Sequence, residues 1–161
     1  MVTRILTFVP CLLLAFLNCL HAQDLAFLDD SHVIDHSMAV CKSISAGDIE
    51  GGFRRFKASS PIPEAQISQL SSGISKVRPE IIAKYGKSLG VELLGTAQVG
   101  KSLLRVIVLE KMEFNGIIWI FSFYKSNSGW LAIAIRSEKA DEVWSLFQGE
   151  GGKSFSNSVL P

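Results

Sequence analysis

Cysteine and net charge are both scarce in this sequence of 161 residues. Of its three cysteines, Cys11 and Cys19 lie in an apolar N-terminal stretch, so only Cys41 remains in the rest of the chain. A single cysteine excludes an internal disulfide, and the fold must rest on a hydrophobic core. Cys41 falls on an apolar helical stripe with Ile34 and Met38, which predicts a buried residue rather than a reactive thiol.

Positive and negative residues are nearly equal in number in this sequence. The formal net charge is +1, and Arg4 in the N-terminal stretch accounts for that excess. The remaining chain is therefore neutral and has no long-range field to attract nucleic acid or anionic lipid. We expect neither nucleic-acid binding nor a charged-surface function.

The N-terminal stretch predicts export. Arg4 precedes an apolar run over 5–20, and the small residue Ala22 is followed by polar residues. A positive charge, an apolar run and a small residue in this order are typical of a secretory signal peptide. We expect cleavage after Ala22, which makes 1–22 a signal peptide and leaves a periplasmic or secreted protein without membrane attachment.

Two other interpretations of this stretch are weaker. An uncleaved membrane anchor requires about 20 mostly apolar residues, and Pro10 interrupts a run of marginal length. A lipoprotein acylated at Cys19 requires a small preceding residue, and Asn18 is bulkier than that.

Residues 23–147 are expected to form one α+β domain, in which helices come first and a sheet second. The predicted helices cover 24–46, then Ile49–Lys57 with Asp48 as N-cap, and then a helix starting near Glu64 that Pro79 breaks or restarts. A last amphipathic segment is predicted over Ala140–Phe147. The tail, 148–161, is rich in glycine and serine and is expected to be disordered.

Four runs rich in valine, isoleucine, leucine and aromatics predict strands: Val91–Val99, Leu103–Phe114, Ile117–Lys125 and Trp130–Arg136. Their connectors are short, and one is the hairpin-forming pair Asn115-Gly116. Short connectors force neighbouring strands to be antiparallel, which gives a four-stranded meander. The two middle runs are apolar at consecutive positions, so both faces of the sheet should be covered. We expect the helices to cover one face and a second copy of the chain to cover the other.

The segment 95–102 matches a phosphate-binding loop, with Gly95, Gly100, Lys101 and Ser102 at the required spacing. Such a loop must open a helix, whose N-terminus then holds the phosphates. Here a strand-like run follows Ser102, and the only downstream aspartate, Asp141, lies in a polar run rather than after an apolar strand, where it could hold magnesium. We interpret this segment as a hairpin turn whose sequence matches the phosphate-loop pattern by coincidence. No nucleotide or other cofactor is expected.

His32 and His36 stand four residues apart, with Asp29 one turn earlier, a spacing that can hold zinc. The stripe that they form lies opposite the predicted apolar side of the helix. We therefore expect a solvated helix face and no metal site.

Acid–base catalysis would need a titratable group in a cleft. Charged residues in the sheet runs, such as Arg105 and Glu110, are expected at edges or rims, and these two lie on opposite faces of their strand. Ser122 stands between two phenylalanines and has no evident base. The sequence therefore assigns no catalytic residue.

Several features together resemble exported proteins of the nuclear transport factor 2-like superfamily. These are Met38–Cys41 leading into Ala46-Gly47-Asp48, the helical stretch Ile67–Gly90, and the meander Val91–Arg136 with Gly129-Trp130 in its last strand. The resemblance implies a cystatin-like α+β roll that forms homodimers, and many such members are domains of unknown function. Enzymes of the superfamily carry aspartate, histidine or tyrosine in the cone between helix and sheet, and no such arrangement maps onto this chain.

We therefore expect an exported, non-catalytic binding or interaction module that dimerises through its sheet. A small apolar ligand is expected in the cone, near Tyr85, Glu110, Trp119 and Tyr124. The alternative is a small isomerase- or cyclase-like enzyme acting on an apolar substrate there, with Tyr85, Tyr124 or Glu110 as its polar group.

Overall fold

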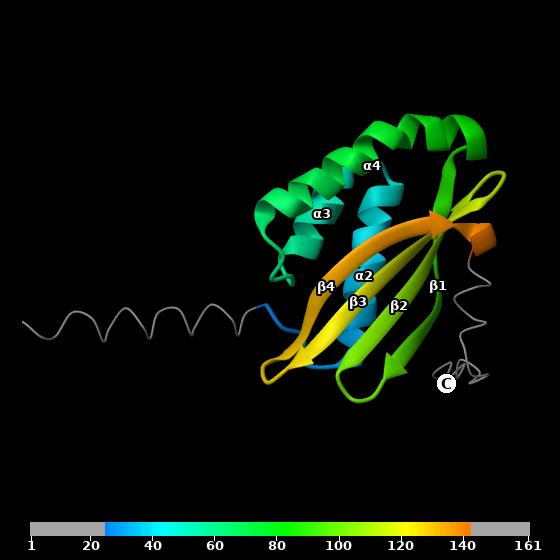
Figure 1. Ribbon diagram of the computed structural model, residues 1–161. Coiled ribbons are helices and arrows are strands. Elements are labelled where there is room, and N and C mark those ends of the chain that lie inside the picture. The colour runs from blue at the N-terminus through cyan, green and yellow to red at the C-terminus, as the bar shows by residue number, and fades with distance from the viewer. Residues whose placement is uncertain (1–24, 143–161) are drawn as a thin grey trace, which may run out of the picture.

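Three helices precede a four-stranded antiparallel sheet in the computed structural model, which describes residues 25–142 (Figure 1). The elements are α2 (Asp30–Ser45), α3 (Ile49–Lys57), α4 (Glu64–Tyr85), β1 (Ser88–Val99), β2 (Leu103–Met112), β3 (Gly116–Ser126), β4 (Gly129–Lys139) and the short η1 (Ala140–Glu142). The predicted α+β order is thus confirmed. The expected signal peptide, 1–22, the expected tail, 148–161, and the end of the segment Ala140–Phe147 lie outside the described residues.

The sheet is the predicted meander, with strand order β1-β2-β3-β4. The first hairpin turns at Gly100-Lys101-Ser102, and the second turns at Asn115, after which Gly116 pairs with Lys111. Two bulges interrupt β1, and one separates Ser122 from Phe123 opposite β4. The bulge on β4 leaves Ile133 as the extra residue, because Ala132 and Ala134 oppose consecutive residues of β3.

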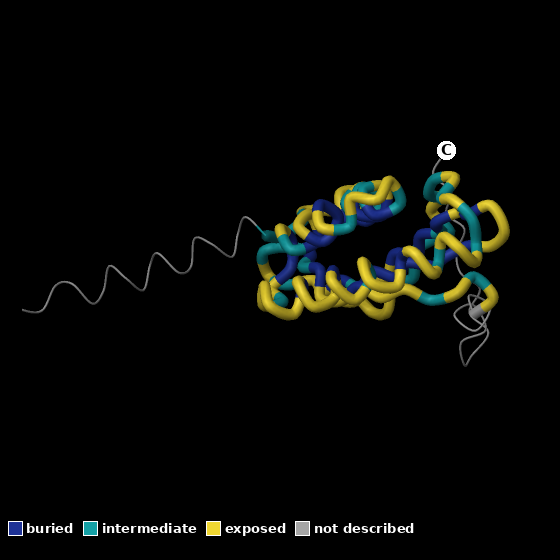
Figure 2. The backbone as a smooth tube through the Cα atoms, turned by 90° about the horizontal axis from the view of Figure 1, so that it is seen from above, coloured by how far each residue is buried: buried dark blue, intermediate teal, exposed yellow. Residues whose placement is uncertain are grey.

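The three helices cover one face of the sheet, which we call the inner face. Alternate residues of β2 and β3 point to it and form the main core with α2 and α3, among them Val106, Val108, Phe121 and Phe123. Figure 2 shows the buried stretches on the inside and the exposed ones at the periphery. A smaller cluster, Ile107, Ile118 and Ile120, lies on the opposite, outer face, in line with the prediction that these strands are apolar on both sides.

Helix α2 begins at Asp30 rather than at residue 24, because Asp29 caps it by accepting the N–H of His32 at 3.0 Å. Its buried residues are Val33, Ser37, Val40, Cys41 and Ile44. The predicted stripe of Ile34, Met38, Cys41 and Ser45 was therefore displaced by about one residue, although the burial of Cys41 is confirmed. Asp48 caps α3 as predicted, accepting the N–H of Gly51 at 2.9 Å.

The prediction that Pro79 breaks or restarts the third helix was wrong. Helix α4 runs without interruption from Glu64 to Tyr85 with Pro79 inside it. Proline removes one backbone hydrogen bond, to the carbonyl four residues earlier. Pro79 and Ser75 are both exposed, so water can satisfy the carbonyl that is freed. Among the described residues, none of the helices is long and apolar enough to cross a membrane.

Gly52 allows α2 and α3 to approach each other closely. A Cβ atom on Gly52 would lie 2.6 Å from Ile44 Cγ1 and 3.1 Å from the carbonyl oxygen of Val40. We predict that Gly52→Ala lowers the free energy of unfolding by about 1–3 kcal/mol, although alanine favours a helix over glycine by about 1 kcal/mol. Urea denaturation measures the change, and the exposed Gly73→Ala in α4 should stabilise the protein instead.

Candidate functional site

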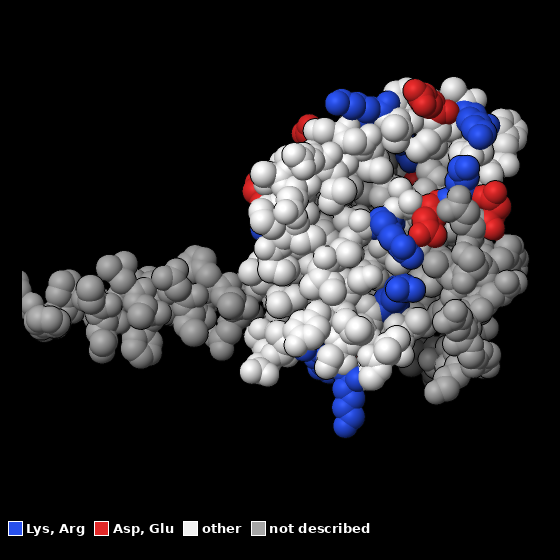
Figure 3. Space-filling model, in the orientation of Figure 1, with Lys and Arg blue, Asp and Glu red and all other residues white. Residues whose placement is uncertain are grey.

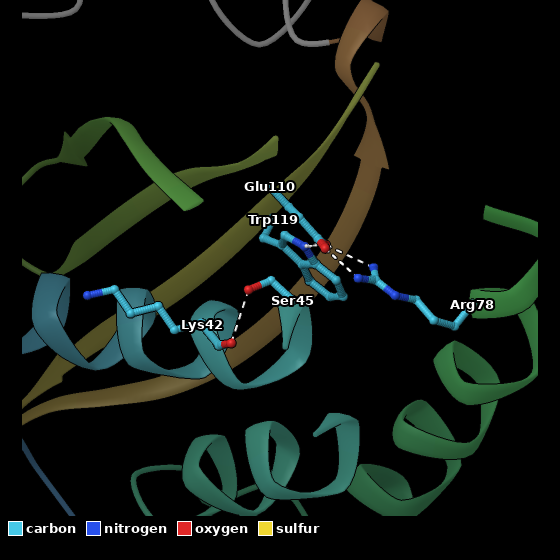
Figure 4. Close-up of polar contacts among 5 residues, drawn as sticks. All are labelled: Lys42, Ser45, Arg78, Glu110 and Trp119. Atoms are coloured by element: carbon cyan, nitrogen blue, oxygen red, sulfur yellow. Dashed lines mark hydrogen bonds and ion pairs between the residues drawn. The ribbon is translucent and has the colours of Figure 1, made fainter. Parts of the chain in front are cut away.

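A buried ion pair joins α4 to the sheet. Glu110 of β2 is 0% exposed and Arg78 of α4 is 6% exposed. Arg78 Nη1 donates to Glu110 Oε2 at 3.0 Å, and Arg78 Nη2 donates to Glu110 Oε1 at 2.5 Å. Figure 4 shows Arg78 reaching across from α4 to the carboxylate. This bidentate geometry is the favourable arrangement for a guanidinium and a carboxylate that are both buried.

Trp119 completes this polar cluster. Its indole Nε1 donates to Glu110 Oε2 at 3.2 Å, from the neighbouring strand β3 (Figure 4). All three donors converge on one carboxylate, which therefore accepts hydrogen bonds on both oxygens. Within the described residues, Arg78 Nε is a buried donor that has no partner.

The prediction that the strand charges lie at edges or rims was wrong for Glu110. Glu110 follows Val106 and Val108 at a spacing of two, so it shares the inner face with them, and Arg78 supplies its counter-charge. Arg105 does lie exposed on the opposite face of the same strand, as predicted.

Two pockets open between α4 and the strands β3 and β4, and we call them together the α4–β4 groove. The first is about 380 Å³ and has Val77, Ile81, Tyr85 and Ile117 among its walls. The second is about 520 Å³ and has Leu70, Gly73, Ile74, Trp119 and Ile135 among its walls. Ser137 of β4 lines both pockets, and on α4 Arg78 stands between Ile74 of one pocket and Ile81 of the other. The ion pair therefore lies at the level where the two pockets meet.

Sequence reasoning missed Arg78, although a signal was present. Ile67, Ser71, Ile74, Arg78, Ile81 and Tyr85 follow one another at alternating spacings of four and three. That spacing places them on one helix face, and Ile67, Ser71 and Arg78 are buried. A charged residue on an otherwise inward face predicts a partner carboxylate in the core.

The predicted ligand residues separate into two groups. Tyr85 lines the first pocket and Trp119 lines the second, with Glu110 behind them. Tyr124 lies apart from these, 47% exposed on the outer face, where it pairs with Leu103. The structure therefore places Tyr85 and Trp119 in the walls of one groove, holds Glu110 on the Trp119 indole outside both pocket linings, and leaves Tyr124 on the other side of the sheet.

The segment that resembles a phosphate-binding loop lies in the first hairpin. Gly95 is within β1, and Gly100, Lys101 and Ser102 form the turn. Strand β2 begins at Leu103, so a strand follows the segment where a phosphate site would need a helix.

The histidine stripe is divided by its surroundings. His32 is exposed, and its Nδ1 lies 3.0 Å from Asp29 Oδ2. The hydrogen bond from the His32 backbone N–H lowers the pKa of Asp29. His36 instead turns inward, so the expected solvated face was wrong for this residue. Within residues 25–142, no cluster of three or more histidine, cysteine, aspartate or glutamate side chains has an arrangement that could hold a metal ion.

His36 lies under the segment that precedes α2. Its ring centroid is 4.7 Å from that of Phe27, and its Nε2 shares a hydrogen bond of 3.0 Å with Ser59 Oγ. Burial, with a smaller contribution from the positive charge of Arg55, lowers the pKa of His36 to about 4. His36 is therefore neutral at physiological pH and belongs to the packing of the N-terminal segment.

Cys41 lies close enough to the ion pair for the charge of Glu110 to affect the pKa of its thiol. Burial raises the pKa of the Cys41 thiol, and the negative charge of Glu110 raises it further. A thiol in these surroundings stays protonated and unreactive.

No protein-family model, no curated protein and no solved structure matches the chain.

Proposed function

We propose that the protein is an exported, non-catalytic binding module that holds an apolar ligand in the α4–β4 groove. The observation that supports this proposal most directly is the pair of pockets on either side of the Arg78–Glu110 pair. Leucine, isoleucine, valine and aromatic side chains line these pockets. Largely apolar clefts with a few polar groups are the usual form of small-molecule sites. The N-terminal sequence pattern, a positive charge followed by an apolar run, is typical of a signal peptide and supports export. The order of three helices and four antiparallel strands is compatible with a cystatin-like roll.

The groups at the groove favour binding over catalysis. Both oxygens of Glu110 accept hydrogen bonds from Arg78 and Trp119, and the guanidinium of Arg78 compensates its charge, so the carboxylate is engaged in the core and lines neither pocket. An isomerase- or cyclase-like enzyme would depend on Tyr85, which lines the first pocket beside Lys84. Tyr124 could not serve such an enzyme at the groove, because it lies on the outer face.

Gly73 offers a direct test of the groove. It lines the second pocket, and a Cβ atom added there would meet nothing within 4 Å. We predict that the leucine side chain of Gly73→Leu obstructs the pocket and weakens the binding of a neutral naphthylamine dye at least tenfold, measured by dye fluorescence. The variant should remain folded, because replacing a helical glycine stabilises a helix by about 1 kcal/mol.

Ser75→Leu is the matched control, since it adds the same side chain to an exposed position of α4 that lines neither pocket. It should bind the dye with unchanged affinity. Equal binding by both leucine variants would place the dye elsewhere and contradict the proposal.

We also propose that the module is a homodimer through the outer face of its sheet. Val99, Leu103, Tyr124 and Leu131 pair across the four strands and form an apolar row on this face. In Figure 1 the strands cross in front of α2. Figure 3, in the same orientation, shows an uncharged area over β3 and β4, with basic side chains beside it and acidic ones near the end of β4. Contiguous apolar surface of this kind marks interaction sites.

Leu103 is 45% exposed at the centre of that row, and we predict that Leu103→Glu converts the dimer into a monomer. A charge buried in an apolar interface is strongly unfavourable. Light scattering at micromolar concentration should give the mass of two chains for the unchanged protein and of one for the variant. Phe114→Glu, in the turn at the opposite end of the sheet, should remain dimeric; a monomeric unchanged protein would refute the dimer.

A further inference from the structure

Strand β4 is the edge strand of the described sheet, and within residues 25–142 the second half of its open edge has no backbone partner. Lys125 of β3 donates its N–H to Ser102, on the β2 side, and alternate residues of an unbulged strand share that direction. Phe121 and Trp119 therefore also point their N–H groups toward β2. Their partners on β4 are Ile135 and Ser137, whose N–H and C=O groups must then point away from β3, toward the open edge.

The first half of the same edge is already paired. Trp130 exchanges backbone hydrogen bonds with Phe27 at 2.8 and 2.9 Å, and the N–H of Ala132 donates to the Ser59 carbonyl at 2.9 Å. After the bulge at Ile133, no residue of 25–142 supplies a backbone partner to the edge-facing groups over 135–139. This unpaired stretch is the side of the α4–β4 groove formed by β4.

The two pockets follow the unpaired edge at the spacing of a strand. Ile135 lines the second pocket, Ser137 lines both, and Lys139 lines the first. Each step of two residues along a strand advances roughly 7 Å, and side chains two residues apart point to the same face. A strand beside β4 would therefore place two alternate side chains in the two pockets, beneath α4.

We propose that the ligand of the α4–β4 groove is an extended peptide segment that adds to β4 as a fifth strand, with apolar side chains at two alternate positions. This inference rests on the proposed function and names its ligand class. Strand addition to an exposed sheet edge is an established mode of peptide recognition, in which backbone hydrogen bonds give affinity and pockets give specificity. A compact apolar molecule would leave the edge groups of Ile135 and Ser137 without partners.

Charge at the groove sets the kind of peptide that fits. Glu80, Lys84, Glu138 and Lys139 surround the first pocket, and Arg136 adjoins the second, within 3.2 Å of Glu138. The two signs are mixed, so a peptide of low net charge is favoured over a strongly acidic or basic one.

The exit of the chain from β4 argues that the peptide comes from another molecule. Ala140 of η1 packs against the outer-face cluster of Ile107, Ile118 and Ile120. The chain therefore leaves β4 on the face opposite the groove.

Ser137 allows the strand pairing to be tested separately from the pockets. Proline at this position removes the edge-facing N–H, and proline is tolerated on sheet edges, whereas Ser137→Ala keeps the N–H. The probe is a labelled nine-residue peptide with isoleucine at two alternate central positions and threonine elsewhere, and anisotropy measures its binding. Ser137→Pro should weaken binding at least tenfold, Ser137→Ala less than threefold, and a peptide with adjacent isoleucines should bind at least tenfold more weakly.

Equal binding by the two Ser137 variants, or by the two peptides, would overturn the inference. Should Ser137→Pro fail to fold, amide hydrogen exchange in the unchanged protein decides. Peptide addition should slow exchange at Ile135, Ser137 and Lys139 at least tenfold, and unaltered exchange would overturn the proposal. Protection of the same amides by dimer formation alone would assign the edge to a second copy and also overturn it.

The dye experiment separates this inference from the proposed function. If the dye binds in the groove and the peptide does not, the peptide is wrong and the apolar binding site stands. If neither binds, both proposals fail.

Discussion

Replacing Glu110 with leucine is expected to lower the free energy of unfolding by about 3–5 kcal/mol, the usual cost of leaving one buried charge without its partner. Arg78, which is 6% exposed in the unchanged protein, loses its carboxylate partner in the variant, and the Trp119 indole loses its acceptor. Urea denaturation followed by fluorescence measures the loss. The effect should be the largest of any single change proposed for this protein.

The double variant Arg78→Met/Glu110→Leu separates the pair from its packing. Because apolar residues of similar volume often replace a buried ion pair at little cost, we expect it to recover most of the loss. Lys111→Ala is the control, since Lys111 of β2 and Glu92 of β1 form an exposed pair worth less than about 1 kcal/mol. A Glu110→Leu variant as stable as the double variant would show that the ion pair does not hold α4 against the sheet.

Acid should weaken the fold through His36. The folded pKa of His36 is about 4, below its ordinary value of 6.5. Between these values the unfolded chain binds a proton that the folded chain does not, so stability rises with pH in this window and falls as pH drops from 6.5 to 4. Each pH unit between the two pKa values is worth about 1.4 kcal/mol, and partial exposure of the ring reduces the total to about 2 kcal/mol.

His36→Gln is the matched control for that effect, because its amide can still bond to Ser59 Oγ and carries no charge at any pH. Carboxylates titrate in both proteins and cancel in the comparison. The difference in unfolding free energy between the two proteins should therefore narrow, or turn in favour of the variant, by about 2 kcal/mol from pH 7 to pH 4. A constant difference across that range would contradict the assigned position of His36.

Local sequence patterns predict most of the fold. The run Val106–Leu109, the Asn115-Gly116 turn and the Asp48 cap each depend on neighbours in sequence, and each is confirmed in the structure. Pro79 shows the limit of such rules: its cost to a helix depends on whether water reaches the freed carbonyl, which is a tertiary property.

The candidate site depends on contacts that local patterns do not contain. Glu110 and Arg78 are 32 residues apart, and only the packing of α4 over β2 reveals that they pair. His36 likewise turns inward because Phe27 and Ser59 fold over it. The separation of Tyr124 from Trp119, in contrast, can be predicted from the sequence. The two residues are an odd number of positions apart on one strand and so cannot share a face.

The two described tryptophans report on the central claim, that the space between α4 and β4 is a ligand site. The Trp119 indole lines the second pocket, whereas the Trp130 indole donates to Asp30 at 2.8 Å, away from the groove. Titration with the neutral naphthylamine dye, followed by ¹H–¹⁵N spectra and assigned with Trp119→Phe and Trp130→Phe, compares their indole N–H resonances directly. We predict that the Trp119 resonance moves to saturation while that of Trp130 stays in place; a bound dye that moves Trp130 and leaves Trp119 unchanged would contradict the account.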